Sequence, residues 1–592
     1  MARIAKLLVA NRGEIAIRIF RACRELGITS AAIYSEADRD ALHLSFADEA
    51  YLVGEAAAAA SYLNIGRVLE VARGAGADAV HPGYGFLAEN PRFAGAVVEA
   101  GLIWIGPPPR AIEATGDKTE ARRTAASVGV ESVPGTLEAI SGPDAIEVFA
   151  GEHGWPVAVK AARGGGGRGF RVVRGAEEAP RAFEAAAREA QLAFGSPKLY
   201  LERYLETPRH IEVQIIGDTH GNLIHLGERE CSLQRRHQKL IEESPSPVME
   251  EGLRARMGAA ALKVARAAGY QSAGTVEFLL EETAEGPRFW FLELNSRLQV
   301  EHPVTEEVIG CDLVKEMIRV AEGARLSLTQ GDVRLRGHAI ECRINAENPA
   351  QGFLPSPGTI GAYREPAGPG IRVDSGVAAG SAVPETYDSL IAKLIVTGVD
   401  RDEAIRRMLR ALDEFQIEDV HTTIPFHRHV VGSEWFSEGR FSTKTVERLD
   451  LSRLPLRAPR RHPESARPPG GVRRQEREVT VELEGKRFDV RFTERLDGRT
   501  ARLKPKPPGP GRRTVRSTGE EAIIAPMQGT IVKTLKAEGD RVSEGEPILV
   551  LEAMKMENLI LSRRDGRISA LRVKAGDSVE RGAVLAEIGL PQ

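Results

Sequence analysis

The chain has 592 residues, 42% of them hydrophobic and 28% charged, which is the composition of a globular protein of about four domains. The net charge of −3 excludes a general attraction to nucleic acid, and no apolar run is long enough to span a membrane. The first residues lack the apolar core of a signal peptide and the four cysteines are widely spaced, so we expect a cytoplasmic protein with reduced thiols.

Residues 5–110 alternate short apolar runs with helical patterns, as in "KLLVA" followed by "NRGEIAIRIFRACRELG". Strands that alternate with amphipathic helices indicate βαβ units and a parallel sheet. The segment "NRGE" stands where a strand turns into a helix, so a ligand could meet that helix N-terminus. The G-x-G-x-x-G spacing of a dinucleotide site is absent.

A glycine-rich loop, "RGGGGRG" at 163–169, joins two predicted strands in the block from 115 to about 205. Its backbone N–H groups can close over phosphates, and Lys160 and Arg168 add positive charge. The alternative is a flexible surface loop, because the spacing is not that of a P-loop.

Acidic side chains stand inside apolar runs between residues 208 and 350. Glu277 ends the predicted strand "TVEF", and Glu293 and Asn295 share one face of "WFLELNSR" because alternate strand residues point the same way. Three oxygen ligands would suit Mg²⁺. The alternative is a set of salt bridges within a sheet.

Basic residues gather near the same segment. Arg297 and Gln299 continue the alternation after Asn295, and Glu301 follows as a candidate general base. The segment "RRHQK" at 235–239, together with Arg343, predicts a positive pocket for a small anion such as bicarbonate. An ordinary ion-pair network is the alternative, and spacing does not exclude it.

Residues 451–520 carry 19 Lys/Arg and 9 Asp/Glu, a balance of +10, in a Pro- and Gly-rich sequence typical of a linker. The strict alternation of "EVTVELEGKRFDVRF" predicts a β-hairpin inside it, which we interpret as a small docking module. No aromatic residues interleave with the basic ones, which disfavours nucleic-acid binding.

An internal repeat follows residue 522. "GDRVSEGEPILVLE" at 539–552 resembles "GDSVERGAVLAEI" at 576–588, which predicts two related halves in a flattened β-sandwich. Lys555 of "LEAMKMEN" falls at the hairpin between the copies. From the residues alone it is an exposed lysine at a turn.

The motifs "NRGEIAIR", "HPGYGFLAEN", "KAARGGGGRG", "RRHQK", "ELNSRLQVEHPVTE" and "FLPSPG" resemble the biotin carboxylase family, which has an ATP-grasp fold, over residues 3–448. "APMQGTI" and "EAMKMEN" resemble a biotinyl carrier domain over 522–589. As a whole the chain resembles the α subunit of a bacterial acyl-CoA carboxylase.

The resemblance implies an α/β fold with these domains: 1–114, a Rossmann-like N-terminal biotin carboxylase domain; 115–335, an ATP-grasp domain with the glycine-rich lid; 336–448, a mixed α/β C-terminal domain; 449–521, the basic linker with its hairpin; and 522–592, the all-β biotinyl carrier domain.

The resemblance also implies a role for each matching residue. ATP would be bound by Lys118, Lys160, Gly166, Gly167, Glu202, Arg203, Tyr204, Leu205, His210, Gln234 and His237. Mg²⁺ or Mn²⁺ would be held by Glu277, Glu293 and Asn295. Bicarbonate and biotin would be bound by Lys239, Arg297, Gln299, Val300 and Arg343. Relatives often carry Lys at the position of Arg203, a departure of little consequence if only its backbone contacts adenine.

In that family's reaction Glu301 would deprotonate bicarbonate, which would attack the γ-phosphate to form carboxyphosphate. Carboxyphosphate would decompose to CO₂ and phosphate, and the phosphate would take the proton from biotin N1 while Arg343 stabilises the ureido oxygen. Lys239 and Arg297 would assist at the bicarbonate, and Lys555 would carry the biotin through an amide.

The expected partners are a separate carboxyltransferase β subunit, a transient biotin-protein ligase, and further copies of the chain in a hetero-oligomeric holoenzyme, without nucleic acid or membrane. Two other functions stay open: a non-catalytic biotin carrier or scaffold, and another ATP-grasp ligase acting on carboxylates. The acyl-CoA substrate would be chosen by the partner subunit, so the sequence does not indicate it.

Overall fold

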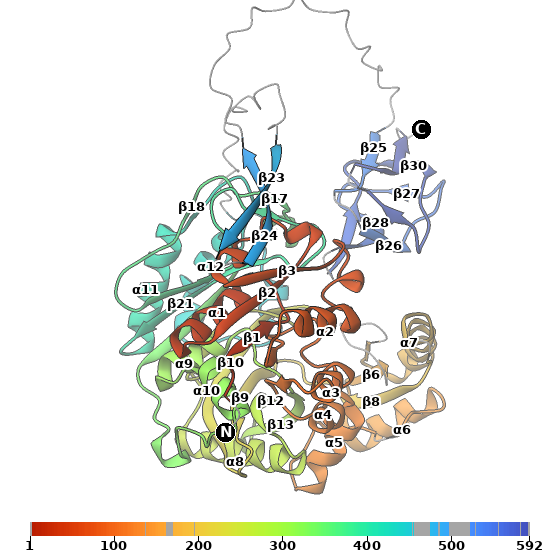
Figure 1. Cartoon of the computed structure of the whole chain (residues 1–592). Coiled ribbons are helices and arrows are strands. Elements are labelled where there is room, and N and C mark those ends of the chain that lie inside the picture. The colour runs from red at the N-terminus through yellow and green to blue at the C-terminus, as the bar shows by residue number, and fades with distance from the viewer. Residues whose placement is uncertain are drawn as a thin grey trace, which may run out of the picture. The chain divides into compact units, whose positions relative to one another are not determined.

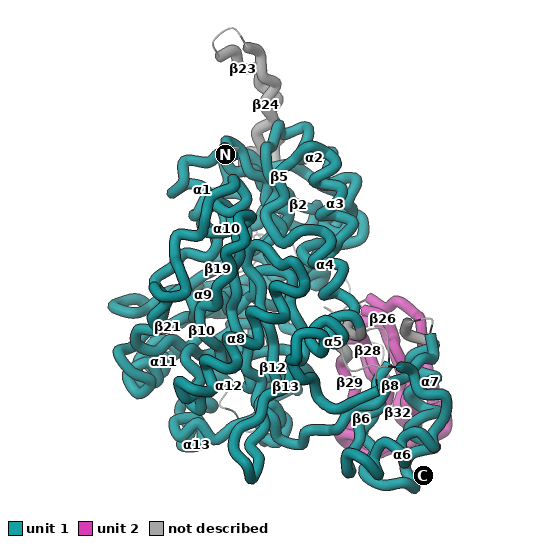
Figure 2. Tube along the Cα trace, turned by 90° about the horizontal axis from the view of Figure 1, so that it is seen from below, with its two compact units in different colours: residues 1–456 teal, residues 457–592 magenta. Residues whose placement is uncertain are grey.

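The computed structural model describes residues 3–136, 138–161, 170–194, 196–452, 454, 474–483, 486–495, 521–526, 529–553, 556–580 and 582–589. The chain forms two compact units, residues 1–456 and 457–592 (Figure 2). The first unit is α/β and the described part of the second consists of strands, which confirms the predicted fold class. Among the described residues, no helix has the length and apolar content needed to cross a membrane.

The first unit begins with a parallel sheet in the order β3-β2-β1-β4-β5. Its strands are β1 (Lys6–Val9), β2 (Thr29–Ser35), β3 (Glu49–Gly54), β4 (Ala79–His81) and β5 (Ile103–Trp104). Its helices are α1 (Gly13–Leu26), α2 (Ile65–Gly74), α3 (Pro91–Glu99) and α4 (Pro109–Gly116). The parallel sheet predicted from the alternating pattern is confirmed, and β1, β2 and β3 are red in Figure 1.

The N-terminus of α1 is packed against another part of the chain. A Cβ added to Gly376 would lie 2.7 Å from the backbone nitrogen of Glu14. The Glu14 carboxylate lies 3.2 Å from the ammonium of Lys393, which is fully buried. Segments from the C-terminal third of the unit therefore pack against this helix end, and a ligand there stays a prediction.

An eight-stranded antiparallel sheet forms the centre of the first unit, in the order β13-β12-β9-β10-β11-β14-β21-β19. Its strands are β9 (Arg209–Gly217), β10 (Leu223–Arg235), β11 (Gln238–Ser244), β12 (Ser272–Thr283), β13 (Gly286–Asn295), β14 (His338–Asn345), β19 (Ile371–Ser375) and β21 (Leu390–Gly398). Because β11 pairs with β14, strands from both sides of the expected boundary at 335–336 share one sheet.

The first unit also contains further helices and three short ladders. The helices are α5 (Lys118–Ser127), α8 (Glu251–Ala267), α9 (His302–Ile309), α10 (Leu313–Ala321), α11 (Arg401–Glu414), α12 (Ile424–Val431) and α13 (Glu434–Ser437). The ladders pair β15 (Glu347–Asn348) with β16 (Leu354–Pro355), β17 (Gly358–Thr359) with β20 (Ala382–Val383), and β18 (Tyr363–Arg364) with β22 (Gln416–Ile417).

A separate three-stranded antiparallel sheet, in the order β7-β6-β8, carries the segment around the glycine-rich loop. Its elements are β6 (Val157–Ala161), β7 (Arg171–Val173), β8 (Leu199–Arg203), α6 (Asp144–His153) and α7 (Ala179–Phe194). The three strands predicted on either side of the loop are confirmed, while residues 162–169 lie outside the described residues.

The second unit contains the predicted hairpin. Strands β23 (Arg474–Leu483) and β24 (Lys486–Arg495) pair antiparallel, with Val479 opposite Val490 and Val481 opposite Phe488. The hairpin predicted from the alternating pattern is therefore confirmed.

The other described strands of the second unit form the predicted two-sheet domain, with strand orders β25-β32-β30-β27 and β29-β28-β26-β31. The strands are β25 (Glu521–Ile524), β26 (Gly529–Thr534), β27 (Arg541–Val542), β28 (Pro547–Ala553), β29 (Met556–Leu561), β30 (Gly566–Leu571), β31 (Ser578–Val579) and β32 (Val584–Gly589). Both copies of the repeat turn at glycines with positive φ: Gly539 (92°) and Gly545 (82°) in one, Gly576 (94°) and Gly582 (85°) in the other. The repeated Gly positions are thus the turns that need left-handed backbone.

Candidate active site

Three glutamates occupy one row of the large sheet. Glu212 of β9 lies opposite Glu277 of β12, which in turn lies opposite Glu293 of β13. Directly opposed residues of antiparallel strands project from the same face. Glu277 stands in the middle of β12, not at a strand end as the sequence predicted. The sequence reasoning missed Glu212, although it follows His210 by two residues on one strand.

Lys239 of β11 joins this row to the turn that precedes α9. Its ammonium lies 2.8 Å from a Glu277 carboxylate oxygen and 2.6 Å from one of Glu301, and it also pairs with Glu212. Burial alone would lower the pKa of Lys239, but the three carboxylates raise it well above its ordinary value. Burial would likewise raise the pKa of Glu277, yet Lys239 and His210 hold it below its usual range.

Glu301 is fully buried at the N-terminus of α9 and is held by two cations. Its carboxylate oxygens lie 2.6 Å from Lys239 Nζ and 2.8 Å from Arg343 Nη2. Burial would raise the pKa of Glu301, but Lys239, Arg343 and Arg229 hold it well below its ordinary value. Glu301 is therefore ionised at neutral pH, which is the state a base requires.

Arg343 of β14 is held through both its side chain and its backbone. Its guanidinium contacts Glu301 and lies 2.5 Å from a Glu242 carboxylate oxygen. Its backbone carbonyl accepts hydrogen bonds from the Thr423 hydroxyl (2.7 Å) and a His427 ring nitrogen (2.6 Å). The sequence reasoning did not single out Glu242, Thr423 or His427, because their meeting with Arg343 depends on strand register and on the packing of α12.

Arg229 of β10 is a second buried organiser that the sequence reasoning missed. It is fully buried, pairs with Glu212 and donates to Gln214 (2.6 Å) and Thr305 (2.9 Å). Burial would lower its pKa, but the carboxylates of Glu212 and Glu301 raise it. A charged residue within the strand "GERECSL" is the sequence signal that could have indicated it.

The turn from Ser296 to Val300 differs from its prediction. β13 ends at Asn295, so the expected strand alternation through Gln299 is wrong. The side chains nevertheless meet, since Arg297 Nη1 donates to Gln299 Oε1 at 2.9 Å and Nη2 lies 3.5 Å from Asn295 Oδ1. Arg297 also pairs with Glu89 at 2.9 Å. The buried amide nitrogen of Gln299 has no hydrogen-bond partner among the described residues, which leaves a donor for an anion.

The predicted positive pocket is balanced by carboxylates in the structure. Lys239 contacts three of them and Arg343 contacts two. Arg235 makes its contacts outside this cluster: it donates to the Gly352 carbonyl at 2.6 Å, and its guanidinium lies 4.9 Å from the centre of the Phe353 ring. The basic residues therefore belong to an ion-pair network, the alternative left open by the sequence, and a pocket for an anion beside it stays a prediction.

The predicted nucleotide residues lie on β6, β8 and the segment that follows. Lys160 and Arg122 both pair with Glu202. The guanidinium of Arg203 lies 2.5 Å from Glu281. Leu205 packs with Val133 and Trp290, and the ring of Tyr204 lies 6.3 Å from that of Phe170.

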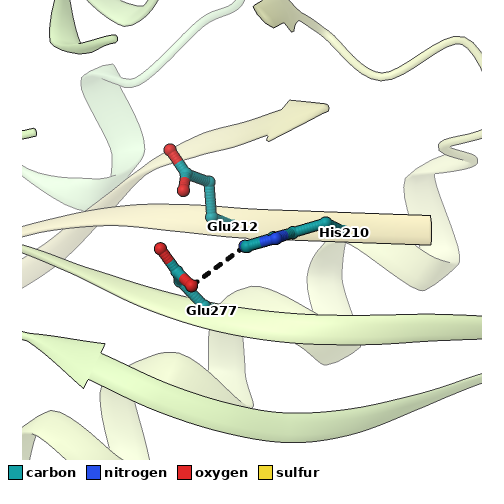
Figure 3. Close-up of side chains that lie close together, drawn as sticks. All are labelled: His210, Glu212 and Glu277. Atoms are coloured by element: carbon teal, nitrogen blue, oxygen red, sulfur yellow. Dashed lines mark ion pairs between the residues drawn. The ribbon is translucent and has the colours of Figure 1, made fainter. Parts of the chain in front are cut away.

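His210 and Gln234 meet on neighbouring strands, with 3.4 Å between a His210 ring nitrogen and the Gln234 amide nitrogen. His210 Nε2 lies 3.0 Å from a Glu277 oxygen; Figure 3 shows this ion pair, with Glu212 on the same strand as His210. Burial would lower the pKa of His210, but Glu277 raises it. His237 lies in the exposed turn between β10 and β11, with φ of 66°.

Several predicted residues lie outside what the structure describes. These are Gly166 and Gly167 of the lid, the side chain of Lys118, and Lys555. Strands β28 and β29 pair antiparallel on either side of positions 554–555, with Ala553 opposite Met556.

The predicted metal ligands form a donor set that fits a hard divalent cation. Glu277 and Glu293 oppose each other, and Asn295 Nδ2 donates to Glu277 Oε1 at 2.8 Å. Carboxylate and amide oxygens are the ligands that Mg²⁺ and Mn²⁺ prefer. His210, Glu212 and Glu277 also place ligand atoms within 4.8 Å of one another, so Glu277 is shared by both groups.

Four family models match the chain. They are the biotin carboxylase N-terminal domain at 3–112, the ATP binding domain of the carbamoyl-phosphate synthase L chain at 117–329, the biotin carboxylase C-terminal domain at 341–448, and the biotin-requiring enzyme family at 521–588.

Relatives match over the whole length. The chain is 46% identical to the biotin-dependent acyl-coenzyme A carboxylase alpha3 subunit of Mycobacterium leprae, with 99% of each chain covered. It is 38% identical to the propionyl-CoA carboxylase alpha chain of Ruegeria pomeroyi, with 98% of this chain and 99% of that one covered.

Solved structures match the first unit. The biotin carboxylase domain dimer of 2-oxoglutarate carboxylase from Hydrogenobacter thermophilus, in complex with MgADP, ADP and bicarbonate, is 47% identical, with a TM-score of 0.71 over 76% of this chain and 98% of that one. The biotin carboxylase–β-γ-ATP complex from Campylobacter jejuni is 46% identical, with a TM-score of 0.72 over 76% and 99%.

The chain therefore belongs to the biotin-dependent carboxylases, in the group whose α chains join biotin carboxylase domains to a biotin domain. It is an ATP-dependent biotin carboxylase fused to a biotin carrier domain.

Proposed function

We propose that the chain carboxylates biotin attached to its own Lys555, through carboxyphosphate, and passes the carboxyl group to a separate carboxyltransferase subunit. One observation carries this proposal: Glu301 is a fully buried carboxyl group held between Lys239 and Arg343, and Lys239 also contacts the Glu277 carboxylate. The candidate base, the candidate metal ligand and the candidate oxyanion donor thus form one connected cluster.

The proposed chemistry follows from these contacts. Bicarbonate would lie beside Arg297, Gln299 and the Val300 backbone, where the unpartnered Gln299 amide offers a donor. Glu301 takes its proton, and the resulting anion attacks the γ-phosphorus of ATP to form carboxyphosphate, with ADP as the leaving group. The bond between the carboxyl carbon and the bridging oxygen of carboxyphosphate then breaks, which gives CO₂ and phosphate, and the phosphate accepts the N1 proton of biotin. The Arg343 guanidinium stabilises the charge on the ureido oxygen until N1 forms its bond to CO₂ and yields carboxybiotin.

The nucleotide and the metal are proposed at the positions matched to the family. ATP is held by Lys118, Lys160 and the lid glycines at its phosphates, by residues 202–205 at its adenine, and by His210, Gln234 and His237. Glu277, Glu293 and Asn295 hold Mg²⁺ or Mn²⁺, which supplies charge neutralisation at the phosphates. The Asn295–Glu277 hydrogen bond supports this assignment because it brings two of the donors together.

The partners are proposed from the relatives. The Mycobacterium leprae relative is a carboxylase subunit and the Hydrogenobacter thermophilus domain is a dimer, so we infer a carboxyltransferase partner and self-association for this chain. A transient biotin-protein ligase and a cytoplasmic location complete the proposal, with the domain limits expected from the sequence.

Two measurements test this function. An avidin blot of the purified chain, with Lys555→Ala as its control, tests biotin attachment. Bicarbonate-dependent ATP cleavage stimulated by free biotin then separates an active ligase from a mere carrier. A chain that binds avidin but shows no such stimulation would be a carrier or scaffold, and this proposal would fail.

A further inference from the structure

Val300 lies in the irregular turn between β13 and α9. A backbone carbonyl in such a turn has no regular hydrogen-bond partner of the kind that a strand or helix provides. The carbonyls of the neighbouring residues accept hydrogen bonds from groups close in sequence. The Leu298 carbonyl accepts from Arg297 Nη1 at 3.3 Å, the Gln299 carbonyl from the His302 ring at 2.8 Å, and the Glu301 carbonyl from the Val304 backbone N–H at 3.3 Å. The Val300 carbonyl instead accepts from Lys393 Nζ at 3.0 Å, a residue 93 positions away on β21.

The residues around Lys393 hold its ammonium beside the Val300 carbonyl. Its side chain is fully buried, 3.2 Å from a Glu14 oxygen of α1 and 3.9 Å from an Asp374 oxygen of β19. Both carboxylates are themselves at most 4% exposed. A buried ammonium needs compensating negative charge, and the two carboxylates supply it. The ammonium also donates a hydrogen bond to the Val300 carbonyl of the turn.

Strand register explains why this lysine reaches the proposed bicarbonate site. Lys393 lies directly opposite Arg343 in the β14–β21 ladder. Arg343 contacts the Glu301 carboxylate at 2.8 Å, and Lys393 contacts the Val300 carbonyl at 3.0 Å. One cross-strand pair of cations therefore holds two consecutive residues of the turn, one by its side chain and one by its backbone.

We propose that Lys393 is a positioning residue of the carboxylation reaction: it fixes the Val300–Glu301 peptide, and with it the orientation of the bicarbonate-binding turn, without touching substrate. The inference rests on the proposed function, which places bicarbonate at Arg297, Gln299 and Val300. A fixed carbonyl also fixes the N–H on the other side of the same planar peptide, which is the Glu301 amide.

The test uses the full-length chain and initial rates of bicarbonate-dependent ATP cleavage with free biotin. Lys393→Met keeps the stem and removes the ammonium, and we expect the KM for bicarbonate to rise about tenfold or more, the range of a lost hydrogen bond to a charged group. The KM for ATP should stay within about twofold, because a general loosening of the fold would move both constants.

Glu14→Gln is the matched variant, because it perturbs the same buried ion pair but leaves the Lys393–Val300 hydrogen bond. Its KM for bicarbonate should stay within about twofold of the wild type. The double variant Lys393→Met/Glu14→Gln removes one buried charge of each sign; it serves as the test if Lys393→Met alone does not fold, and should show the same rise. Lys444→Met, on the exposed Lys444–Glu447 pair, is the surface control.

An unchanged KM for bicarbonate in a folded Lys393→Met or double variant would overturn the positioning role and leave the proposed function intact. An equal rise in Glu14→Gln would also overturn it, because charge balance rather than the Val300 contact would then be responsible. A wild-type chain without bicarbonate-dependent ATP cleavage would overturn the proposed function itself.

Discussion

At the scale of single residues, the candidate site depends on charges that are buried in pairs. Glu301 has no solvent exposure, and its ionised state depends on Lys239 and Arg343 rather than on water. Removing one member of such a group leaves the others uncompensated, which costs more than the loss of a surface ion pair. Substitutions here should therefore preserve shape and change only charge or proton affinity.

Glu301→Gln keeps the side-chain shape but cannot accept a proton. We expect bicarbonate-dependent phosphate release to fall by about 10²–10⁴-fold, the usual contribution of a general base. Phosphate release at saturating ATP and bicarbonate measures this. Glu285→Gln, in the exposed turn between β12 and β13, should keep wild-type activity. A Glu301→Gln chain as active as this control would exclude Glu301 as the base.

Glu347 makes stability depend on pH. Burial raises its pKa from 4.5 to about 7, despite its hydrogen bond from Ser389. Between those two values the folded chain keeps a proton that the unfolded chain has lost, so the free energy of unfolding falls as pH rises through this window. The loss is complete above about pH 7 and lowers the free energy of unfolding by at most about 3 kcal/mol.

Glu347→Gln should remove this pH dependence, because the amide cannot ionise. Its melting temperature should exceed that of the wild type by a few degrees at about pH 8 and match it at about pH 5. Thermal unfolding followed by circular dichroism measures both, with Glu447→Gln, at an exposed position, as a control without effect. The same difference at both pH values would mean that Glu347 does not titrate in this window.

At the scale of elements, register in the large sheet decides which acidic residues meet. Glu212, Glu277 and Glu293 come from three strands and align in one row. Lys239 and Arg343 enter the same cluster from β11 and β14. A shift of one residue in any strand would turn its side chain to the other face and break the cluster.

The Mg²⁺ dependence of ATP cleavage tests whether this row of glutamates binds the metal. Glu293→Gln keeps an oxygen but removes a negative charge from the proposed Mg²⁺ site, so more Mg²⁺ should be required to reach half-maximal ATP cleavage. We expect a rise of about tenfold or more, since carboxylate count sets the affinity for hard cations. Magnesium titrations of the wild type and the variant measure this, after removal of metal with a chelator. Equal half-maximal concentrations would exclude Glu293 as a ligand.

At the scale of the whole molecule, the chain joins two compact units, residues 1–456 and 457–592, through a segment of linker composition. A tether of this kind raises the effective concentration of one unit at the other. Carboxylation within one chain should therefore be insensitive to dilution.

Two complementary variants test the tether. Lys555→Ala keeps the proposed catalytic residues but has no attachment lysine, and Glu301→Gln keeps the lysine but lacks the base. Mixed after purification, they should carboxylate biotin at a rate per chain that falls in proportion to concentration, well below the wild-type rate at about micromolar protein. Carboxylated carrier, detected by mass spectrometry over a dilution series, measures both rates. A mixture as fast as the wild type at every dilution would contradict the benefit of the tether.

The sequence by itself determined the classes of the elements and the repeated domain. The parallel sheet, the strands around the glycine-rich loop and the hairpin at 474–495 follow from local periodicity and turn residues. The glycines of the repeat occupy turns with positive φ because only glycine adopts that backbone without strain. Motif resemblance named Glu277, Glu301, Lys239 and Arg343, which the structure does bring together.

Only the tertiary structure decided how charge is balanced and which distant residues complete the site. The expected positive pocket is a neutralised network, because strand pairing places Glu212 and Glu242 beside its cations. Lys393 reaches Val300 because it stands opposite Arg343 in a ladder formed by strands far apart in sequence. Local patterns predict the face on which a side chain lies, but its partner depends on strand order and register, which result from long-range packing.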